Sequence, residues 1–216
     1  GAPSIGFNIT LPHEQFPNPY STPELTFRFH YFGMRKMHLA MRANALAVFP
    51  GGFGTMDELF ELLTLVQTGK RDLLPIVLVD HRGGSYWKTW LTFIEEHLLL
   101  RGLISPSDLS LFHVASSVEA AVREVTQFYK VYHSMRFVRE KLVLRLQHEI
   151  DDTLLGHLNA EFGDILASGE IERVDPHAHE ADNPATLNLP RLRLHFNRRD
   201  VGRLRLLVNM LNQCVP

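Results

Sequence analysis

The sequence has 216 residues, with 22 lysines and arginines against 24 aspartates and glutamates, a formal net charge of −2, and 45% hydrophobic residues. This composition is that of an ordinary soluble globular protein, and it disfavours a nucleic-acid-binding coat or a polybasic membrane anchor. The single cysteine, Cys214, excludes an internal disulfide framework and a cysteine-rich zinc site. Because no apolar run reaches the roughly 20 residues that span a bilayer, we expect a cytoplasmic protein with no membrane partner.

Short apolar runs alternate with helical patterns through the first part of the chain. The predicted strands lie near residues 4–10, 45–49, 75–80 and 110–115, and the predicted helices near 23–43, 55–68, 86–101 and 117–130. Strands fed by intervening helices form a parallel sheet, and continuous apolar runs are typical of strands covered on both faces. We therefore predict an α/β domain over residues 1–130, built on a doubly wound parallel sheet.

The pattern changes after residue 130, where we predict a mixed α/β extension over residues 131–216. Residues 135–147 and 151–167 are predicted as amphipathic helices, followed by a polar loop, a strand at 191–196 and a closing helix. In that strand, apolar residues alternate with a face predicted to be exposed, which carries Arg191, Arg193 and His195.

Charge is segregated along this extension. Residues 149–182 hold ten acidic side chains and one basic one, whereas residues 191–205 hold six arginines and one aspartate. Opposite signs predict mutual pairing, within the chain or across a dimer; the alternative is two solvated faces.

The most specific segment is residues 50–58, Pro-Gly-Gly-Phe-Gly-Thr-Met-Asp-Glu, between a predicted buried strand and a predicted helix. Glycines let backbone N–H groups approach an anion closely, and the start of the helix favours a phosphate. The spacing matches neither a Walker A loop nor the G-x-G-x-x-G fingerprint. The alternative is a capping box, in which Thr55 and Glu58 satisfy each other's backbone donors and touch no ligand.

This segment resembles the P-G-G-x-G-T-x-x-E signature of the Lonely Guy family, which is often described as "possible lysine decarboxylase". A second match is the pair Arg35-Lys36, which resembles the Arg-Lys pair that the family carries on the preceding helix. The resemblance covers roughly residues 1–125. It implies a Rossmann-like dimer that hydrolyses the N-glycosidic bond of nucleoside 5′-monophosphates, cytokinin nucleotides among them, to free base and ribose 5-phosphate. Lysine decarboxylation finds no support, since no residue pattern resembles a pyridoxal-phosphate lysine motif.

The resemblance also implies roles for individual residues. Those expected to hold the 5′-phosphate are Gly51, Gly52, Gly54 and Thr55. Arg35 and Glu58 are the expected catalytic pair, with Glu58 stabilising charge on the ribose and Arg35 fixing phosphate or ribose. The proline-rich loop at residues 11–20 is similar to that of longer-loop bacterial members, and the further candidate substrate contacts are His13, Glu14 and Lys36.

Three other expectations follow. The family's first strand and glycine-bearing turn have no match here, so we expect a partial Rossmann-like fold that begins inside a domain, its missing part removed or supplied by another segment. A non-catalytic nucleotide or cofactor carrier on the same fold is the alternative function. Although His177, His179 and Glu180 lie close in sequence, nothing fixes a coordination geometry, so we expect no metal, and likewise no cofactor.

Overall fold

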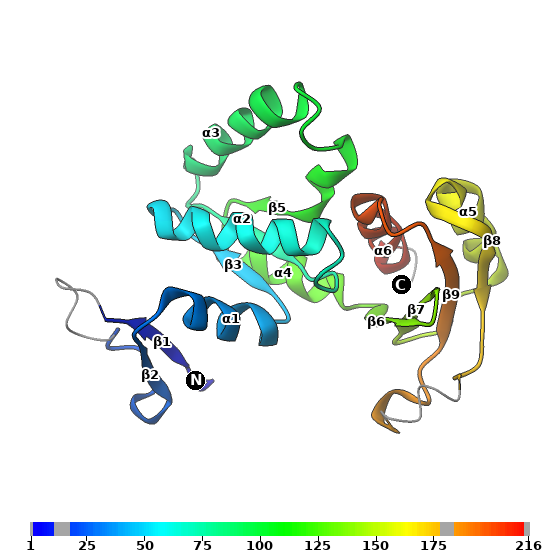
Figure 1. Cartoon of the computed structure of the whole chain (residues 1–216), viewed down its shortest axis with the longest axis horizontal. Coiled ribbons are helices and arrows are strands. Elements are labelled where there is room, and N and C mark those ends of the chain that lie inside the picture. Colours follow the sequence, from blue (N-terminus) through cyan, green and yellow to red (C-terminus); the bar gives the residue numbers. More distant parts are fainter. Residues whose placement is uncertain (1, 11–17, 178–183, 214–216) are drawn as a thin grey trace. The chain divides into compact units, whose positions relative to one another are not determined.

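The computed structural model describes residues 2–10, 18–177 and 184–213 (Figure 1). The chain divides into two compact units, residues 1–44 and residues 45–216, and each is described by itself. His13 and Glu14, together with His179, Glu180 and Cys214, lie outside the described residues.

The first unit pairs two short parallel strands and packs one helix on them. Strand β1 (Gly6–Ile9) pairs with β2 (Thr26–Phe29), and helix α1 (Phe32–Arg42) follows. The prediction of one helix over 23–43 is wrong in its first half, because the alternating, aromatic-rich Thr26–Phe29 forms a strand. His38 lies with its ring centre 5.5 Å from that of Phe29 and 6.2 Å from that of Phe7, so it packs against aromatic rings.

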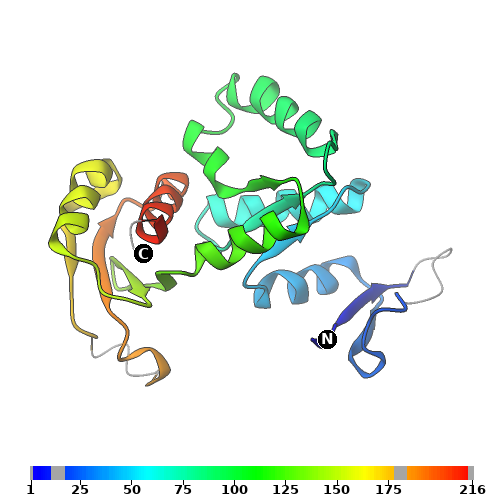
Figure 2. The ribbon, with the colours of Figure 1, turned by 180° about the vertical axis from the view of Figure 1, so that it is seen from behind.

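The second unit contains three of the four strands that the sequence predicts for a parallel sheet, whereas the first predicted strand, β1, pairs in the separate sheet of the first unit. Strands β3 (Leu46–Val48), β4 (Ile76–Val79) and β5 (His113–Ala115) pair in the order β3-β4-β5. All four residues of β4 are buried, as expected for a strand covered on both faces. Helices α2 (Phe53–Gln67) and α4 (Val118–Phe128) lie on opposite faces of this sheet, as the front and back views show (Figures 1 and 2).

The loop between β4 and β5 carries a long helical excursion, as predicted. Helix α3 (Tyr86–Phe93) continues as a π-helical segment (Ile94–Leu99), and a 3₁₀ segment (Pro106–Leu111) precedes β5. Trp87 is fully buried, and its indole N–H donates to the Val79 carbonyl at 3.0 Å. This bond fixes the start of α3 against the end of β4.

The extension is an antiparallel sheet with two helices. Strands β6 (Tyr132–Val138), β7 (Lys141–Leu146), β8 (Leu166–Arg173) and β9 (Arg191–Phe196) pair in the order β6-β7-β9-β8, and the helices are α5 (Asp152–Phe162) and α6 (Val201–Gln213). The predicted helix over 135–147 is wrong, because these residues form most of the β6–β7 hairpin. Its turn uses Arg139 with φ of 56°, and five consecutive residues of β7 are buried, a pattern that suits a central strand.

Strand β8 replaces the end of a predicted helix and the start of the predicted polar loop. The predicted strand at 191–196 is confirmed as β9, and Arg193 pairs with Glu172 of β8 at 3.1 Å. Arg191 was expected on the exposed face, but it is buried and donates to the carbonyls of Thr186, Leu187 and Leu189. It therefore fastens the segment that leads into β9.

Helix α6 joins the extension to the parallel-sheet region. Arg205 is buried, pairs with Glu124 of α4 at 2.8 Å and lies 4.3 Å above the ring of Phe128. The Asn212 side chain accepts from the amides of Val131 and Tyr132 at 2.8 and 3.0 Å and donates to the Phe128 carbonyl. These contacts satisfy backbone groups at the end of α4.

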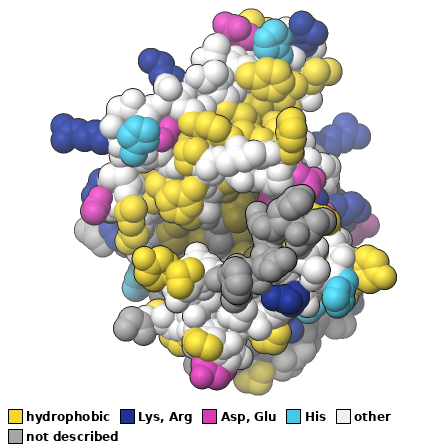
Figure 3. Space-filling view, turned by 90° about the vertical axis from the view of Figure 1, so that its left-hand side faces the viewer, with side chains coloured by type: hydrophobic (Ala, Val, Ile, Leu, Met, Phe, Trp, Pro, Cys, Tyr) yellow, Lys and Arg dark blue, Asp and Glu magenta, His cyan; other side chains and the backbone are white. Residues whose placement is uncertain are grey.

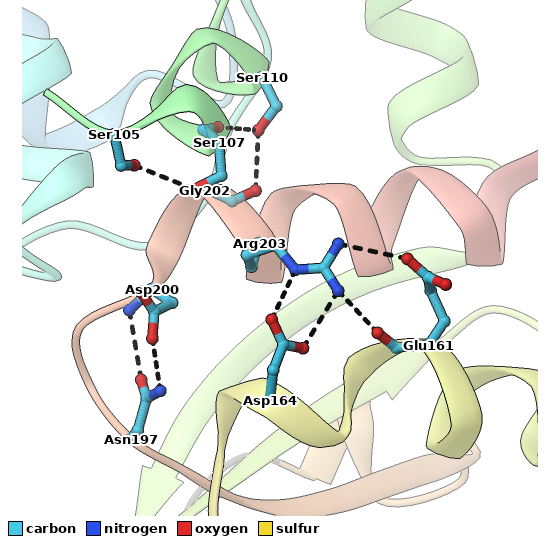
Figure 4. Close-up of polar contacts among 9 residues, drawn as sticks. All are labelled: Ser105, Ser107, Ser110, Glu161, Asp164, Asn197, Asp200, Gly202 and Arg203. Atoms are coloured by element: carbon cyan, nitrogen blue, oxygen red, sulfur yellow. Dashed lines mark hydrogen bonds and ion pairs between the residues drawn. The ribbon is translucent and has the colours of Figure 1, made fainter. Parts of the chain in front are cut away.

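The start of α6 is held from two sides (Figure 4). Arg203 donates to both carboxylate oxygens of Asp164, at 3.0 and 3.1 Å, and reaches Glu161. This arrangement confirms that the arginine-rich and acidic stretches pair within the chain. On the other side, the hydroxyl of Ser110, in the 3₁₀ segment, donates to the Gly202 carbonyl at 2.8 Å.

Candidate functional site

The glycine-rich loop joins the end of β3 to the start of α2, at the carboxyl end of the parallel sheet. Ligands of open parallel sheets bind at this end. Helix α2 begins at Phe53, and Gly52 is its N-cap. The amides of Thr55 and Met56 donate to the Gly52 carbonyl at 3.1 and 3.2 Å, so the amides of Phe53 and Gly54 come before the first intrahelical bond. The loop thus offers backbone donors at the positive end of a helix dipole.

Thr55 and Glu58 do not form the capping box that was the alternative interpretation of this segment. That box requires Thr55 at the N-cap with Glu58 three residues later. Thr55 instead lies in the first turn of α2, and the N-cap residue, Gly52, has no side chain to cap with. Thr55 and Glu58 are both half-buried. Capping therefore does not explain why a threonine and a glutamate stand three residues apart at this helix start.

The three loop glycines differ in what the chain itself requires of them. A Cβ on Gly51 would lie 2.2 Å from Thr55 Oγ1, so packing within the loop demands glycine there. A Cβ on Gly52 or Gly54 would meet no atom within 4 Å, and neither glycine has a positive φ. Because the fold tolerates a side chain at both positions, close approach by a ligand is a physical reason for glycine at these two positions.

A network behind the loop holds it in place. The hydroxyl of Tyr86, at the start of α3, donates to the Gly51 carbonyl. The buried Asp80 carboxylate, at the end of β4, accepts from the amides of His81 and Tyr86 at 2.8 and 3.2 Å. Burial acts to raise the pKa of Asp80, but amide hydrogen bonds and the neighbouring His81 outweigh it and leave the pKa below its ordinary value. Asp80 is therefore a charged anchor for the β4–α3 loop.

A cavity of about 640 Å³ lies between this network and α2. Its lining residues are Pro50, Met56, Asp80, His81, Ser85, Tyr86, Thr89, Trp90 and Phe93. On a helix with 100° per residue, Met56 and Glu58 point about 200° apart. The cavity therefore borders the flank of α2 opposite to Glu58.

The structure brings some predicted residues together and leaves others apart. Gly51, Gly52, Gly54 and Thr55 share the loop and first turn of α2, and Glu58 follows one turn, about 4.5 Å, along the same helix face. Arg35 and Lys36 lie on α1 in the other unit, where the Arg35 Nε donates to the Phe7 carbonyl at 3.1 Å. The pairing of Arg35 with Glu58 stays a prediction.

Asp80, Gly84 and Tyr86 are site residues that the sequence reasoning missed. A Cβ on Gly84 would lie 2.1 Å from the Asp80 carboxylate, so glycine is required beside this anchor. An aspartate directly after a buried strand, followed by Gly83-Gly84 and a helix, was the available signal. Among the described residues, no three His, Cys, Asp or Glu side chains form a group that could hold a metal, and no described helix is long and apolar enough to cross a bilayer.

Comparison with known proteins gives relatives that match part of the chain. Over 94 residues the chain is 32% identical to a cytokinin riboside 5′-monophosphate phosphoribohydrolase of Arabidopsis thaliana, covering 44% of this chain and 42% of that protein. It is 31% identical over 96 residues to the protein of that name from Rhodococcoides fascians (44% and 46%), and 32% over 99 residues to a probable one from Oryza sativa subsp. japonica (46% and 44%). The chain thus spans less than half the length of these relatives.

A family model described as "Possible lysine decarboxylase" matches residues 1–125, which is more than half of the chain. The match contains both the Arg35-Lys36 pair and the glycine-rich loop with Glu58. The chain belongs to this family, the Lonely Guy family.

Proposed function

We propose that the protein hydrolyses the N-glycosidic bond of nucleoside 5′-monophosphates, releasing the free base and ribose 5-phosphate. The observation that carries the proposal is the pair of glycines at 52 and 54, which the fold itself does not require, at the start of a helix that bears Glu58 one turn later. This spacing suits a substrate with an anionic end and a neighbouring reacting carbon. The names of the relatives indicate cytokinin riboside 5′-monophosphates as one substrate class.

In the proposed reaction, the loop amides and Thr55 bind the 5′-phosphate, and the ribose lies along α2 beside Glu58. The bond between C1′ and the base nitrogen breaks, a water oxygen bonds to C1′, and one water proton goes to the departing base. Positive charge builds on the ribose as the base leaves, so the Glu58 carboxylate stabilises the transition state and orients the water. Arg35, whose guanidinium stays protonated, contributes by holding phosphate or ribose.

The experiment is to incubate the protein with AMP and with an N6-substituted analogue and to separate the products. The proposal expects adenine or the substituted base together with an equal amount of ribose 5-phosphate. A carrier on the same fold would bind the nucleotide and return it intact, and that result would replace the proposal with the carrier alternative.

We also propose that the protein acts as a homodimer. Helix α1 has no buried residue among those described, and its exposed large apolar side chains are Phe32, Met34, Met37, Leu39 and Met41. Hydrophobic side chains are frequent in the surface view of Figure 3. Because monomers rarely expose so much apolar surface, a second copy, or a further segment of the fold, is expected to cover it. Sedimentation showing a monomer at micromolar concentration would contradict dimerisation.

A further inference from the structure

Tyr86 makes a contact that the reaction described above does not use. It is the first residue of α3, and its hydroxyl donates to the carbonyl of Gly51, 35 residues earlier in the chain. Both residues belong to the second unit. The bond joins the start of one helix to the loop that precedes another.

The geometry of the peptide bond gives this contact a consequence. The Gly51 carbonyl and the Gly52 N–H belong to the same peptide unit, and the chain has no cis peptide bond among the described residues. In a trans peptide the C=O and the N–H point in opposite directions. Holding the carbonyl towards α3 therefore turns the Gly52 N–H away from α3, to the opposite side of the loop.

Tyr86 is itself held rigidly enough to set this orientation. Its amide donates to the Asp80 carboxylate at 3.2 Å, and its ring meets the ring of Trp87 edge-on, with centres 4.8 Å apart and planes at 86°. Trp87 in turn is fully buried and bonded to the Val79 carbonyl. Tyr86 thus links the glycine-rich loop to the end of β4, so the position of that strand sets the position of the Gly51 carbonyl.

We propose that Tyr86 is a positioning residue that fixes the Gly51–Gly52 peptide so that the Gly52 N–H faces the substrate phosphate. The proposal rests on the phosphate-binding role given to the loop above. Tyr86 does not touch substrate, and it acts through the peptide that it holds. Without the hydroxyl, this peptide is free to rotate, and its N–H has to be ordered each time a ligand binds.

The test is Tyr86→Phe, which removes only the hydroxyl and keeps the ring that packs on Trp87. The matched control is Tyr31→Phe, since Tyr31 is 75% exposed and its side chain makes no cap bond at the start of α1. Binding of AMP and of adenosine is measured by calorimetry for each variant, together with thermal melting and the kinetics of AMP hydrolysis.

We expect Tyr86→Phe to weaken AMP binding about tenfold, the order expected for one hydrogen bond to a charged group, while adenosine binding stays unchanged. The loss should appear in KM with kcat nearly constant, because the phosphate is bound alike in ground and transition states. Tyr31→Phe should match the wild type.

The outcomes separate this inference from the proposed function. If the wild type prefers AMP to adenosine and Tyr86→Phe keeps that preference, the role of Tyr86 is overturned while the phosphate loop stands. If Tyr86→Phe weakens AMP and adenosine equally and lowers the melting temperature, the tyrosine is only structural and the inference fails. If the wild type shows no preference for AMP, the phosphate loop itself is refuted, and this inference with it.

Discussion

Replacing Gly52 and Gly54 by alanine separates folding from ligand binding at the loop. The added methyl groups would meet no atom of the chain within 4 Å, so neither creates a clash. Gly54 lies in the first turn of α2, where alanine gains up to about 1 kcal/mol of helix stability over glycine. We therefore expect the free energy of unfolding of Gly54→Ala to match or slightly exceed that of the wild type. Gly52→Ala places alanine at the N-cap of α2, so its free energy of unfolding should fall by no more than about 1 kcal/mol.

Binding of a nucleotide should respond in the opposite direction. A methyl group beside the loop amides keeps the phosphate from close approach, and each lost hydrogen bond to a charged group costs about 1.5–3 kcal/mol. AMP should therefore bind each variant more weakly, with a dissociation constant roughly 10 to 150 times that of the wild type. Adenosine, which has no phosphate, should bind either variant as it binds the wild type.

The assay pairs urea unfolding with AMP titration, and Gly156→Ala is the control. Gly156 is an exposed glycine within α5, and a Cβ there also meets nothing within 4 Å. It should be as stable as the wild type or more so, with normal AMP affinity. If Gly52→Ala and Gly54→Ala fold normally and bind AMP as tightly as this control, no ligand approaches these glycines and the reasoning is refuted.

Three further predictions concern the extension and its attachment. Gly202→Ala should destabilise by about 1–3 kcal/mol in urea unfolding, because its Cβ would lie 2.3 Å from the Ser107 carbonyl oxygen, a backbone atom; unchanged stability would contradict this packing. Asn212→Ala leaves buried backbone groups at the end of α4 without hydrogen-bond partners, so it should lower the free energy of unfolding by about 3 kcal/mol or more in the same measurement. A decrease below about 1 kcal/mol would mean that water replaces the side chain. The pKa of Asp164 is lowered by hydrogen bonds from Arg203, against burial, so its stabilising contribution is present above the ordinary carboxyl pKa of about 3.9 and disappears as pH falls through the lower folded value. Asp164→Asn should therefore be less stable than the wild type at neutral pH but not in strong acid, and a difference independent of pH would rule this out.

The parallel-sheet region could be predicted because its sequence signals are strong. The run Ile76–Val79 is apolar on both faces, flanked by helical patterns and too short for a buried helix, so it indicates a buried strand. The sequence also indicated the glycine-rich loop, but it did not give the residue at which α2 begins. The start of α2 at Phe53, before Thr55, decides against the capping box, and sequence places helix ends only within a few residues.

The extension was predicted less well because its strands carry helix-like residues. Residues 135–147 contain leucines, arginines and a lysine at spacings that suit a helix, yet tertiary pairing with β9 makes them a hairpin. The burial of Arg191 could not be predicted, since it donates to carbonyls of the segment before β9, which the sequence pattern does not place. Tyr86 was missed for the same reason, because its partner is a backbone oxygen 35 residues away.

The most direct test of the account is the kinetics of Glu58→Gln. A carboxylate that stabilises charge developing on the ribose acts mainly in the transition state, so kcat for AMP hydrolysis should fall by about 10² or more, while AMP affinity and unfolding stability change little. Arg35→Ala should weaken AMP binding and, with it, lower kcat/KM, since its charge acts in ground and transition states alike. Full activity in Glu58→Gln, with adenine and ribose 5-phosphate released at the wild-type rate, would contradict the catalytic role of Glu58 and with it the proposed mechanism.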